Sequence, residues 1–406
     1  MKIIYVSHYF SPEIGAPSAR IHEMAQAWLR AGHQVEVVTG FPNHPQGELY
    51  PGYQRQRYAL EEMDGIRVHR VWTYITPNQG LIRRTLGHIS LWFSALLFAA
   101  KHVDNPDLVI GTSPTLFSVM AARRLALRKG VPWVMEVRDL WPGIFVDLGV
   151  IKNLTVIKIL EAWELWLYRQ ADKIVTVTDG FRENISQRGI ELDKIHTVPN
   201  GADLETFQPG GKPADLVKEM NLEGKFVVLY LGAHSISQKL DVILDAAHQL
   251  SDIEKIAFLF VGDGNQKEAL MERAIKEQIE NLIFHPPIPK ELVPSYYHLA
   301  DVCLVPLRNV PLFDTFIPSK MFEIMAMGKP ILASLKGEAA RILEASGGAV
   351  ITSPEDLQGI VKAIRDLYQD PRRRAELGQN GRQYVERQYS RESLAEKYIT
   401  IMQEIV

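Results

Sequence analysis

The sequence predicts an α/β protein made of two doubly wound domains. Short and almost entirely apolar runs alternate with segments of helical spacing, a pattern typical of parallel strands that are buried on both faces. The alternation occurs twice, and a stretch rich in Gly, Pro, Asn and Asp at 198–213 separates the two series. The length of 406 residues also suits two domains of ordinary size.

Each series begins with a strand, and helical segments lie between the strands. One helical stripe, which includes Ile21 and Trp28, is ended by Gly32. We place an N-terminal domain at 1–198 and a C-terminal domain at 199–387, and we expect a C-terminal helix at 388–406 to complete the first domain. The predicted strands are KIIYVSH, QVEVVTG, IRVHRVW, DLVIGTS, PWVMEVRD, KIVTVT and KIHTVP, then FVVLYLGA, IAFLFVGDG, NLIFHPP, DVCLVPL and PILAS.

Composition and charge narrow the class of protein. The 46% hydrophobic and 23% charged residues are normal for a globular enzyme, and a single cysteine, Cys303, excludes an internal disulfide framework and suits a reducing compartment. The chain starts directly with an apolar strand, so we expect no signal peptide and a cytoplasmic location.

The first half of the chain is basic and the second half acidic. The net charge is −3, yet residues 51–130 hold 11 Lys and Arg against 5 Asp and Glu, which predicts that the first half faces something anionic. Nucleic acid is not the expected partner, because zinc-finger spacing, an RNP-like aromatic strand and a long basic run are all missing.

The segment IPSKMFEIMAMGKPIL, 317–332, carries two charges on an otherwise apolar helix. Pro318 and Ser319 are typical of a helix start, so Lys320 would lie at the positive end of the helix dipole. Glu323 is flanked by apolar residues, where a carboxylate needs a partner. A simple Lys320–Glu323 ion pair is one explanation. The other is a ligand with an anionic part for Ser319 and Lys320 and hydroxyls for Glu323, as in a nucleoside diphosphate.

Two loops of the first series follow strands. In SHYFSPEIGAPSAR, 7–20, Gly15 permits close backbone approach before a helix, where an anion is favoured. The G-x-G-x-x-G pattern is absent, but Glu36 mimics a ribose-binding acid, so NAD binding stays open as an alternative. In EVRDLWP, 136–142, Asp139 beside Arg138 could bind an acceptor hydroxyl or take its proton, or the two could form a surface ion pair.

Two loops of the second series have the composition of ligand-binding turns. In LGAHSISQKLDVILDAA, 231–247, Gly232 opens the first βα turn, a phosphate-binding position, and Gln238 and Lys239 lie near the next helix start. Lys239 could bind phosphate or be a solvated helix residue. In VGDGNQ, 261–266, two glycines would let the backbone approach a flat base; we include Gly262, Asp263 and Gly264 among the candidates.

The sequence does not favour a metal-dependent hydrolase or a serine hydrolase. The sequence offers no Cys/His cluster and no D-x-D pair, so we expect no metal site, and it lacks the G-x-S-x-G elbow of serine hydrolases.

Four segments in this order, SHYFSPEIGAPSAR, EVRDLWP, TVPNGADLETFQP and IPSKMFEIMAMGKPI, give the chain a resemblance to the retaining GT-B glycosyltransferases of family 4. The resemblance covers essentially the whole length and is nearest to the WbuB-like, N-acetylfucosaminyltransferase-like branch. It implies the GT-B fold, with two Rossmann-like domains and an interdomain cleft. It also implies a nucleotide-sugar donor in the C-terminal domain and an acceptor in the N-terminal one.

The resemblance also implies roles for individual residues. Glu323 matches the second of two family glutamates separated by seven residues, which holds the ribose; the first falls at Thr315, and Asp314 beside it could substitute. Ala233 and Gln238 stand where the family often has Arg and Lys. The phosphate charge would then fall to Lys320, and to the shifted Lys239.

The family motifs place the acceptor and the diphosphate as well. We assign Arg20, Arg138 and Asp139 to acceptor binding, with Asp139, Lys320 and Glu323 as the catalytic residues. Gly15 would let backbone amides meet the diphosphate. Because Lys320 and helix dipoles can stabilise the leaving group, neither a metal nor a cofactor beyond the nucleotide sugar is expected.

The expected reaction is a retaining transfer of an N-acetylated sugar from a UDP-sugar to a polyprenyl-diphosphate-linked glycan in surface polysaccharide biosynthesis, such as O-antigen or exopolysaccharide. Segment 82–102 has a basic start and an apolar part too short to span a bilayer. It could be a buried helix or an amphipathic patch on anionic lipid. We expect a peripheral protein on the cytoplasmic face of the inner membrane.

Two other functions stay open at this point. Non-hydrolysing UDP-sugar 2-epimerases share the fold, and an isomerase of that kind would act on a UDP-N-acetylhexosamine without an acceptor. The loss of the first glutamate also leaves room for a catalytically idle nucleotide-sugar-binding module, which would bind UDP but turn nothing over.

Overall fold

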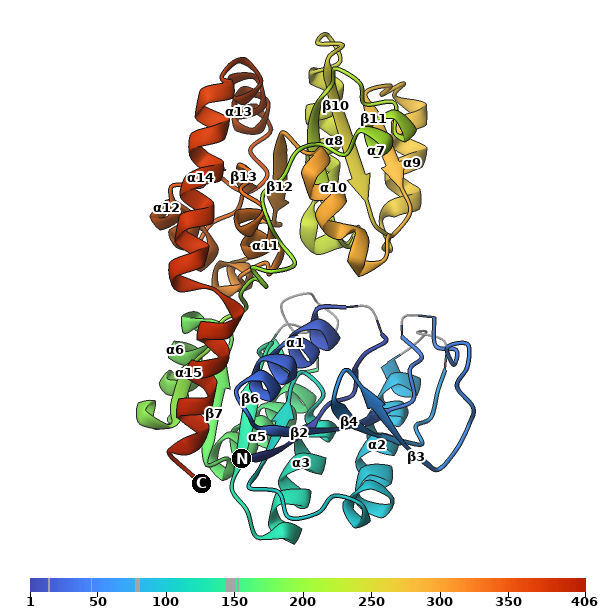
Figure 1. Cartoon of the computed structure of the whole chain (residues 1–406), viewed down its shortest axis with the longest axis vertical. Coiled ribbons are helices and arrows are strands. Elements are labelled where there is room, and N and C mark those ends of the chain that lie inside the picture. The colour runs from blue at the N-terminus through green and yellow to red at the C-terminus, as the bar shows by residue number, and fades with distance from the viewer. Residues whose placement is uncertain (14, 45, 77–80, 144–150, 152) are drawn as a thin grey trace. The chain divides into compact units, whose positions relative to one another are not determined.

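The chain forms two compact α/β units in the computed structural model (Figure 1), which describes all residues except 14, 45, 77–80, 144–150 and 152. The first unit comprises Met1–Asn200 and Arg391–Val406, and the second comprises Gly201–Ser390. Each unit has its own sheet and its own apolar core. The predicted class, two doubly wound α/β domains, is therefore confirmed.

The first unit is built around a sheet with the strand order β3-β4-β2-β1-β5-β6-β7-β8. All of its described strand pairs are parallel except β3 with β4. Its described elements are β1 (Lys2–Val6), α1 (Ala16–Arg30), β2 (Gln34–Gly40), β3 (Tyr58–Met63), β4 (Ile66–Val71), α2 (Leu81–Leu97), η1 (Ala99–Lys101), β5 (Leu108–Thr112), α3 (Leu116–Lys129), β6 (Trp133–Val137), α5 (Leu154–Gln170), β7 (Lys173–Thr176), α6 (Asp179–Gln187), η2 (Leu192–Lys194), β8 (Ile195–Thr197) and α15 (Arg391–Gln403).

Strand β3 was missed by the sequence analysis. It pairs antiparallel with β4 through a two-residue turn at Asp64 and Gly65, both with positive φ. An Asp-Gly pair between two short runs is the usual signal for such a hairpin. The Asp-Gly pair was present in the sequence, but YALEEM was not predicted as a strand because its residues are only partly apolar and the strand is partly exposed.

The C-terminal segment is helical but not continuous. Helix α14 ends at Gln388 and α15 begins at Arg391, so the helix predicted at 388–406 starts only at Arg391. Helix α15 packs on α1, and the Trp28 Nε1–H donates to the Ala395 carbonyl at 3.2 Å. The last helix therefore completes the core of the first unit.

Helix α2 covers much of the segment that was predicted to be either a core helix or a surface patch. Leu91 and Ala95 are buried, whereas Leu86, Phe93 and Leu97 are exposed, so α2 is not a fully buried helix. No helix in the described part of the chain is long and apolar enough to cross a membrane.

The second unit contains a fully parallel sheet with the strand order β11-β10-β9-β12-β13-β14. Its elements are α7 (Ala214–Glu219), β9 (Phe226–Leu231), η3 (Ile236–Gln238), α8 (Leu240–Gln249), β10 (Ile256–Val261), α9 (Lys267–Lys276), β11 (Leu282–His285), η4 (Lys290–Leu292), α10 (Val293–Leu299), β12 (Val302–Pro306), η5 (Pro311–Thr315), α11 (Lys320–Ala326), β13 (Ile331–Ser334), α12 (Glu338–Ser346), β14 (Ala349–Thr352), α13 (Leu357–Gln369) and α14 (Pro371–Gln388).

Helices cover both faces of this sheet. Residues of α10 and α11 pack with Val227 and Leu229 on one face, and residues of α8, α9 and α13 pack with Val228 and Tyr230 on the other. In a parallel sheet all carboxyl ends meet at one edge, where ligands of open α/β sheets bind. The loops that follow β9, β10 and β12 emerge at this edge.

Candidate functional site

Lys320 begins α11 and reaches the carboxyl end of β9. The buried neighbours Met321 and Phe322 anchor the helix in the core. The Lys320 ammonium lies 4.1 Å from the centroid of the Tyr230 ring, a cation–π distance. A Cβ added at Gly232 would lie only 2.5 Å from the Lys320 Nζ, so the absence of a side chain there makes room for the ammonium.

The Lys320 ammonium has no counterion in the described part of the chain. No hydrogen bond or ion pair joins it to any described residue, and the distance to Glu323 exceeds ion-pair range, so the predicted Lys320–Glu323 pair is not formed. Burial lowers the pKa of Lys320 to about 8, although Glu323 raises it. The site thus offers an unpaired cation in a partly dry environment, where an anion would be bound strongly.

Glu323 lies one turn further along α11. Its Oε2 accepts a hydrogen bond from the Tyr297 hydroxyl at 3.1 Å. Burial raises the pKa of Glu323, while the Tyr297 hydrogen bond and the charges of Lys290 and Lys320 lower it. The carboxylate is half-buried and can accept further hydrogen bonds from ligand hydroxyls.

The start of α11 differs in one detail from the prediction. Ser319 is the residue before the helix, as predicted, but its side chain makes no capping hydrogen bond. The carbonyls of Pro318 and Ser319 instead accept bonds from Met321 and Phe322 in the first turn. The Ser319 hydroxyl is therefore not used to cap the helix.

Gly262 and Gly264 let two loops cross at close range. A Cβ at Gly262 would lie 2.1 Å from the Gly232 carbonyl oxygen, and one at Gly264 would lie 2.4 Å from that of His234. Both glycines have positive φ. The Asp263 carbonyl accepts a hydrogen bond from His234 N–H at 2.8 Å, which joins the two loops. The glycines that were predicted to meet a base are thus needed by the protein's own backbone.

His234 is a candidate that the sequence analysis missed. Its side chain is 0% exposed and is surrounded by the rings of Tyr230, Phe260 and Phe284. Neither ring nitrogen has a hydrogen-bond partner among the described residues. Burial, helped by the charges of Lys267 and Lys320, lowers the pKa of His234 to about 4, so the imidazole is neutral. The available signal was its place two residues after Gly232.

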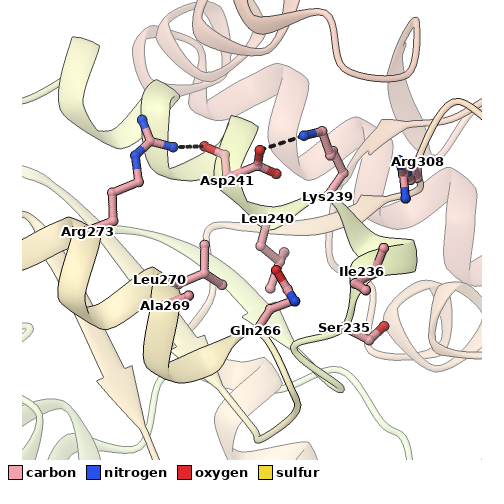
Figure 2. Close-up of a pocket in the computed structure, with 10 residues that line it drawn as sticks. All are labelled: Ser235, Ile236, Lys239, Leu240, Asp241, Gln266, Ala269, Leu270, Arg273 and Arg308. Atoms are coloured by element: carbon pink, nitrogen blue, oxygen red, sulfur yellow. Dashed lines mark hydrogen bonds and ion pairs between the residues drawn. The ribbon is translucent and has the colours of Figure 1, made fainter.

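Lys239 lines a pocket whose lining residues do not include Lys320. Its Nζ binds the Asp241 carboxylate at 2.6 Å, as Figure 2 shows, and its backbone has a φ of 50°, which is uncommon for a lysine. The pocket has a volume of about 250 Å³ and includes neither Gly232 nor Gln238. Its lining residues are Ser235, Ile236, Lys239, Leu240, Asp241, Gln266, Ala269, Leu270, Arg273 and Arg308.

The structure shows Lys239 paired with Asp241, beside a pocket whose lining residues include neither Gly232 nor Lys320. Its predicted contact with the phosphate stays a prediction. The backbone at Lys239 is left-handed, which spacing along a helix does not reveal. Lys320 is left as the cation beside Gly232.

Asp314 lies in η5, beside the loop that begins α12. Its Oδ1 is buried without a hydrogen-bond partner in the described part of the chain, and its Oδ2 lies 3.7 Å from the Lys336 Nζ. The Thr315 hydroxyl donates to the Leu312 carbonyl at 2.8 Å and so serves the local turn. Of the two residues, Asp314 is the one with a free acceptor.

Asp139 and Arg138 follow β6 in the first unit. Burial raises the pKa of Asp139 to about 6, although the charge of Arg138 lowers it. Among the described residues, the Asp139 carboxylate makes no hydrogen bond and no ion pair, and the Arg138 Nε is buried without a partner. The predicted surface ion pair is thus replaced by two half-buried charges, and a carboxylate of this pKa suits a general base near neutral pH.

Arg20 is a structural residue. Its side chain is 4% exposed and makes four hydrogen bonds. The Nε donates to Glu136 at 3.0 Å, and the other nitrogens donate to the Val198 carbonyl, the Pro199 carbonyl and Asn200. These donors are used inside the unit, so the structure gives Arg20 a structural role, and its predicted contact with the acceptor stays a prediction.

The two remaining candidates of the first unit lie near the start of the chain. Gly15 directly precedes α1, and residue 14 before it is outside the described residues. Glu36 is buried and bound to Lys2, Arg67 and His69 at 2.9–3.0 Å. Its carboxylate is thus unavailable to a ribose, which argues against the NAD alternative.

No group of three or more His, Cys, Asp or Glu side chains that could hold a metal ion is found among the described residues.

The comparisons with known proteins agree with this architecture. Residues 15–201 match the model of the glycosyl transferase 4-like domain, and residues 212–384 match that of the glycosyl transferases group 1. The two models together match most of the chain, which therefore belongs to the GT-B glycosyltransferases.

Individual relatives give the same class. The chain is 27% identical to WcaI of Escherichia coli strain K12, which is assigned to colanic acid biosynthesis as a glycosyl transferase, over 98% of this chain and 99% of WcaI. The fold is similar to that of sucrose-phosphate synthase from Thermosynechococcus elongatus, with a TM-score of 0.77 at 19% identity over 99% and 98% of the two chains. It is also similar to that of Anabaena HepE in complex with UDP and glucose, with a TM-score of 0.74 at 16% identity over 99% of each chain.

Proposed function

We propose that this glycosyltransferase moves a sugar from a UDP-sugar to a glycan acceptor with retention at the anomeric carbon. The observation that carries the proposal is the unpaired Lys320 ammonium over Tyr230 and Gly232, with the Glu323 carboxylate one turn away. A cation and a hydroxyl acceptor at this spacing suit the diphosphate and the ribose of one nucleotide.

The relatives support the pathway and the donor class. WcaI is named for colanic acid biosynthesis, and HepE has been solved with UDP and glucose. We therefore propose a role in surface polysaccharide biosynthesis, with UDP as the leaving group. The resemblance to the WbuB-like branch favours an N-acetylated sugar such as N-acetylfucosamine.

The proposed mechanism divides the work between the two units. The bond between the anomeric carbon and the β-phosphate oxygen breaks, and the acceptor oxygen bonds to the same face of that carbon. Lys320 stabilises the negative charge that develops on the departing diphosphate, without a metal ion. Asp139 binds the acceptor hydroxyl, and the proton passes to Asp139 or to the departing phosphate. UDP leaves as the second product.

The proposed acceptor is a polyprenyl-diphosphate-linked glycan. The basic stretch 51–130 supports an anionic partner for the first unit, and Arg138 next to Asp139 supplies a cation beside the proposed acceptor site. An acceptor of this kind would place the enzyme at the cytoplasmic face of the inner membrane as a peripheral protein.

Diphosphate recognition can be tested by calorimetry with UDP, UMP and uridine. The proposal predicts that affinity falls in that order, because each step removes negative charge from beside Lys320. Equal affinity for UDP and uridine would show that the diphosphate is not recognised at this site, and would leave Lys320 without its proposed ligand.

Replacing Glu323 with alanine should weaken UDP binding by about 1–3 kcal/mol, the range for losing a charged hydrogen-bond partner. The matched control is Glu344→Ala, which removes an exposed carboxylate from α12 in the same unit. The effect should be nearly absent with 2′,3′-dideoxy-UDP, because that ligand lacks the hydroxyls. Unchanged UDP affinity in the Glu323 variant would remove this residue from the site.

The pH dependence of kcat/KM should be bell-shaped, with limbs near pH 6 and pH 8. The Asp139 carboxylate gains a proton as pH falls through its pKa of about 6, and the Lys320 ammonium loses its proton as pH rises through its pKa of about 8. Both must be charged for the reaction, so the rate is highest near pH 7. In Lys320→Gln the alkaline limb should disappear while the acid limb stays; an unchanged alkaline limb would assign it to another group.

A further inference from the structure

Exposed apolar side chains gather on three neighbouring helices of the first unit. Of the 17 large hydrophobic residues that are exposed in the described part of the chain, eight lie on α2, α3 and α5. The strongest are Leu154 and Ile159 on α5, which are 74% and 62% exposed. The eight are Leu86, Phe93, Leu97, Leu127, Leu154, Val156, Ile159 and Trp166.

Contacts across α3 join the three helices into one layer. The Arg128 side chain on α3 donates to the Leu96 carbonyl of α2 at 2.7 Å. On the other side, the Arg123 guanidinium lies 4.6 Å from the Trp166 ring centroid and donates to Gln170 at 3.0 Å, both on α5. We call this layer of α2, α3 and α5 the three-helix surface (Figure 1).

The charges on the three-helix surface are almost all positive. Helices α2 and α3 contain no Asp or Glu. On α5, Glu164 is buried and paired with Arg188, which leaves Glu161 as the exposed acid among the described side chains. The exposed bases are Arg83, Arg124, Arg128, Lys158 and Arg169.

We propose that the three-helix surface binds an anionic lipid bilayer. Apolar side chains set among Lys and Arg are the composition of segments that lie in a membrane interface, where the side chains enter the acyl boundary and the bases meet lipid phosphates. Trp166 adds an amphipathic ring, which favours the same boundary. No described helix can cross the bilayer, so the contact is peripheral.

The charge pattern selects a lipid surface over a second copy of the chain. In a two-fold symmetric dimer the same patch meets itself, so these exposed bases would face one another and repel. An anionic bilayer instead complements them and supplies an apolar phase for Leu154 and Ile159.

This inference extends the proposed lipid-linked acceptor, but its test needs no nucleotide and no turnover. Flotation of the full chain is measured with vesicles of phosphatidylcholine alone and of phosphatidylcholine mixed with phosphatidylglycerol. Binding is expected to the mixed vesicles, to weaken as salt is raised, and to be much weaker to phosphatidylcholine alone.

Two variants separate the apolar and the charged contributions. The double variant Leu154→Ser, Ile159→Ser is expected to lower the partition coefficient at least about tenfold, because two side chains no longer enter the apolar phase. Its matched control is Ile275→Ser, which changes a 77% exposed residue on α9 of the second unit. The double variant Arg124→Gln, Lys158→Gln should lower binding to the mixed vesicles alone, with exposed Arg372→Gln, Arg373→Gln on α14 as the control.

UDP affinity and the melting temperature of all four variants are expected to equal those of the unchanged protein, because every substituted side chain is exposed. Equal flotation of test and control variants would overturn the proposal. Equal binding to vesicles with and without phosphatidylglycerol would also overturn it. A third contradicting result would be self-association of the chain that the Leu154→Ser, Ile159→Ser variant abolishes. Loss of UDP binding with flotation intact would overturn the proposed function and leave this surface standing.

Discussion

A Lys320→Gln protein is expected to transfer sugar with a kcat about 10²–10³-fold below that of the unchanged enzyme, the usual cost of removing one group that stabilises developing negative charge. Glutamine keeps the length and polarity of the side chain but loses the charge. The diphosphate would then leave without the cation that lies over Tyr230. Initial rates at saturating donor and acceptor measure the effect.

The matched control for this variant is Lys276→Gln, which removes an exposed lysine from α9 in the same unit. The control should keep its full rate. Removal of a buried cation also relieves a desolvation cost, so Lys320→Gln should melt no lower than the unchanged protein. A lysine that serves only the fold would show the opposite result, with a lower melting temperature and an unchanged kcat.

An Asp139→Asn protein should lose about 10²–10⁴-fold in kcat/KM for the acceptor, the range for a positioned general base. Asparagine can still bind a hydroxyl but cannot take its proton near neutral pH. UDP affinity should not change, because Lys320 and Glu323, which are proposed to bind the nucleotide, belong to the second unit. The acid limb of the pH profile should disappear in this variant, since Asp139 is the group with a pKa of about 6.

The matched control for Asp139 is Asp104→Asn, which changes an exposed carboxylate of the same unit. A loss of only two- to threefold in Asp139→Asn would show that this residue positions the acceptor while the departing phosphate takes the proton. Weaker UDP binding in Asp139→Asn would contradict its assignment to the acceptor.

The fold could be predicted from the sequence because its signal is local and repeated. Buried parallel strands are apolar on both faces, and the regular βα alternation predicts a doubly wound architecture. The hairpin strand β3 escaped because only one of its faces is covered, and the break between α14 and α15 escaped because Tyr389 and Ser390 are not helix breakers by type.

The site residues could be predicted from the sequence where they lie together in one short segment. Lys320 and Glu323 stood out because charges are costly on an apolar helix, and the structure shows that they do not neutralise each other. The environments of Arg20 and His234 were missed because they come from distant parts of the chain, whereas Lys239 departs from helix spacing through its own left-handed backbone. Arg20 meets Glu136 and Asn200, and His234 enters a ring of aromatic side chains. The spacing of residues along the sequence does not predict such contacts.

The use of Gly262 and Gly264 could not be predicted from residue type. Their composition indicated a loop that a base can approach, and the structure uses the same freedom to cross two backbones at Gly232 and His234. A glycine-rich turn is compatible with both uses, so the residue type alone does not decide between them.

UDP release from the purified protein shows whether sugar transfer depends on an acceptor. The assay uses a panel of UDP-sugars, each with and without a polyprenyl-diphosphate-linked sugar. Release is expected from one UDP-sugar, raised by the acceptor and strongly lowered in Lys320→Gln. UDP binding without release, or conversion of a UDP-N-acetylhexosamine to its 2-epimer in the absence of acceptor, would contradict it.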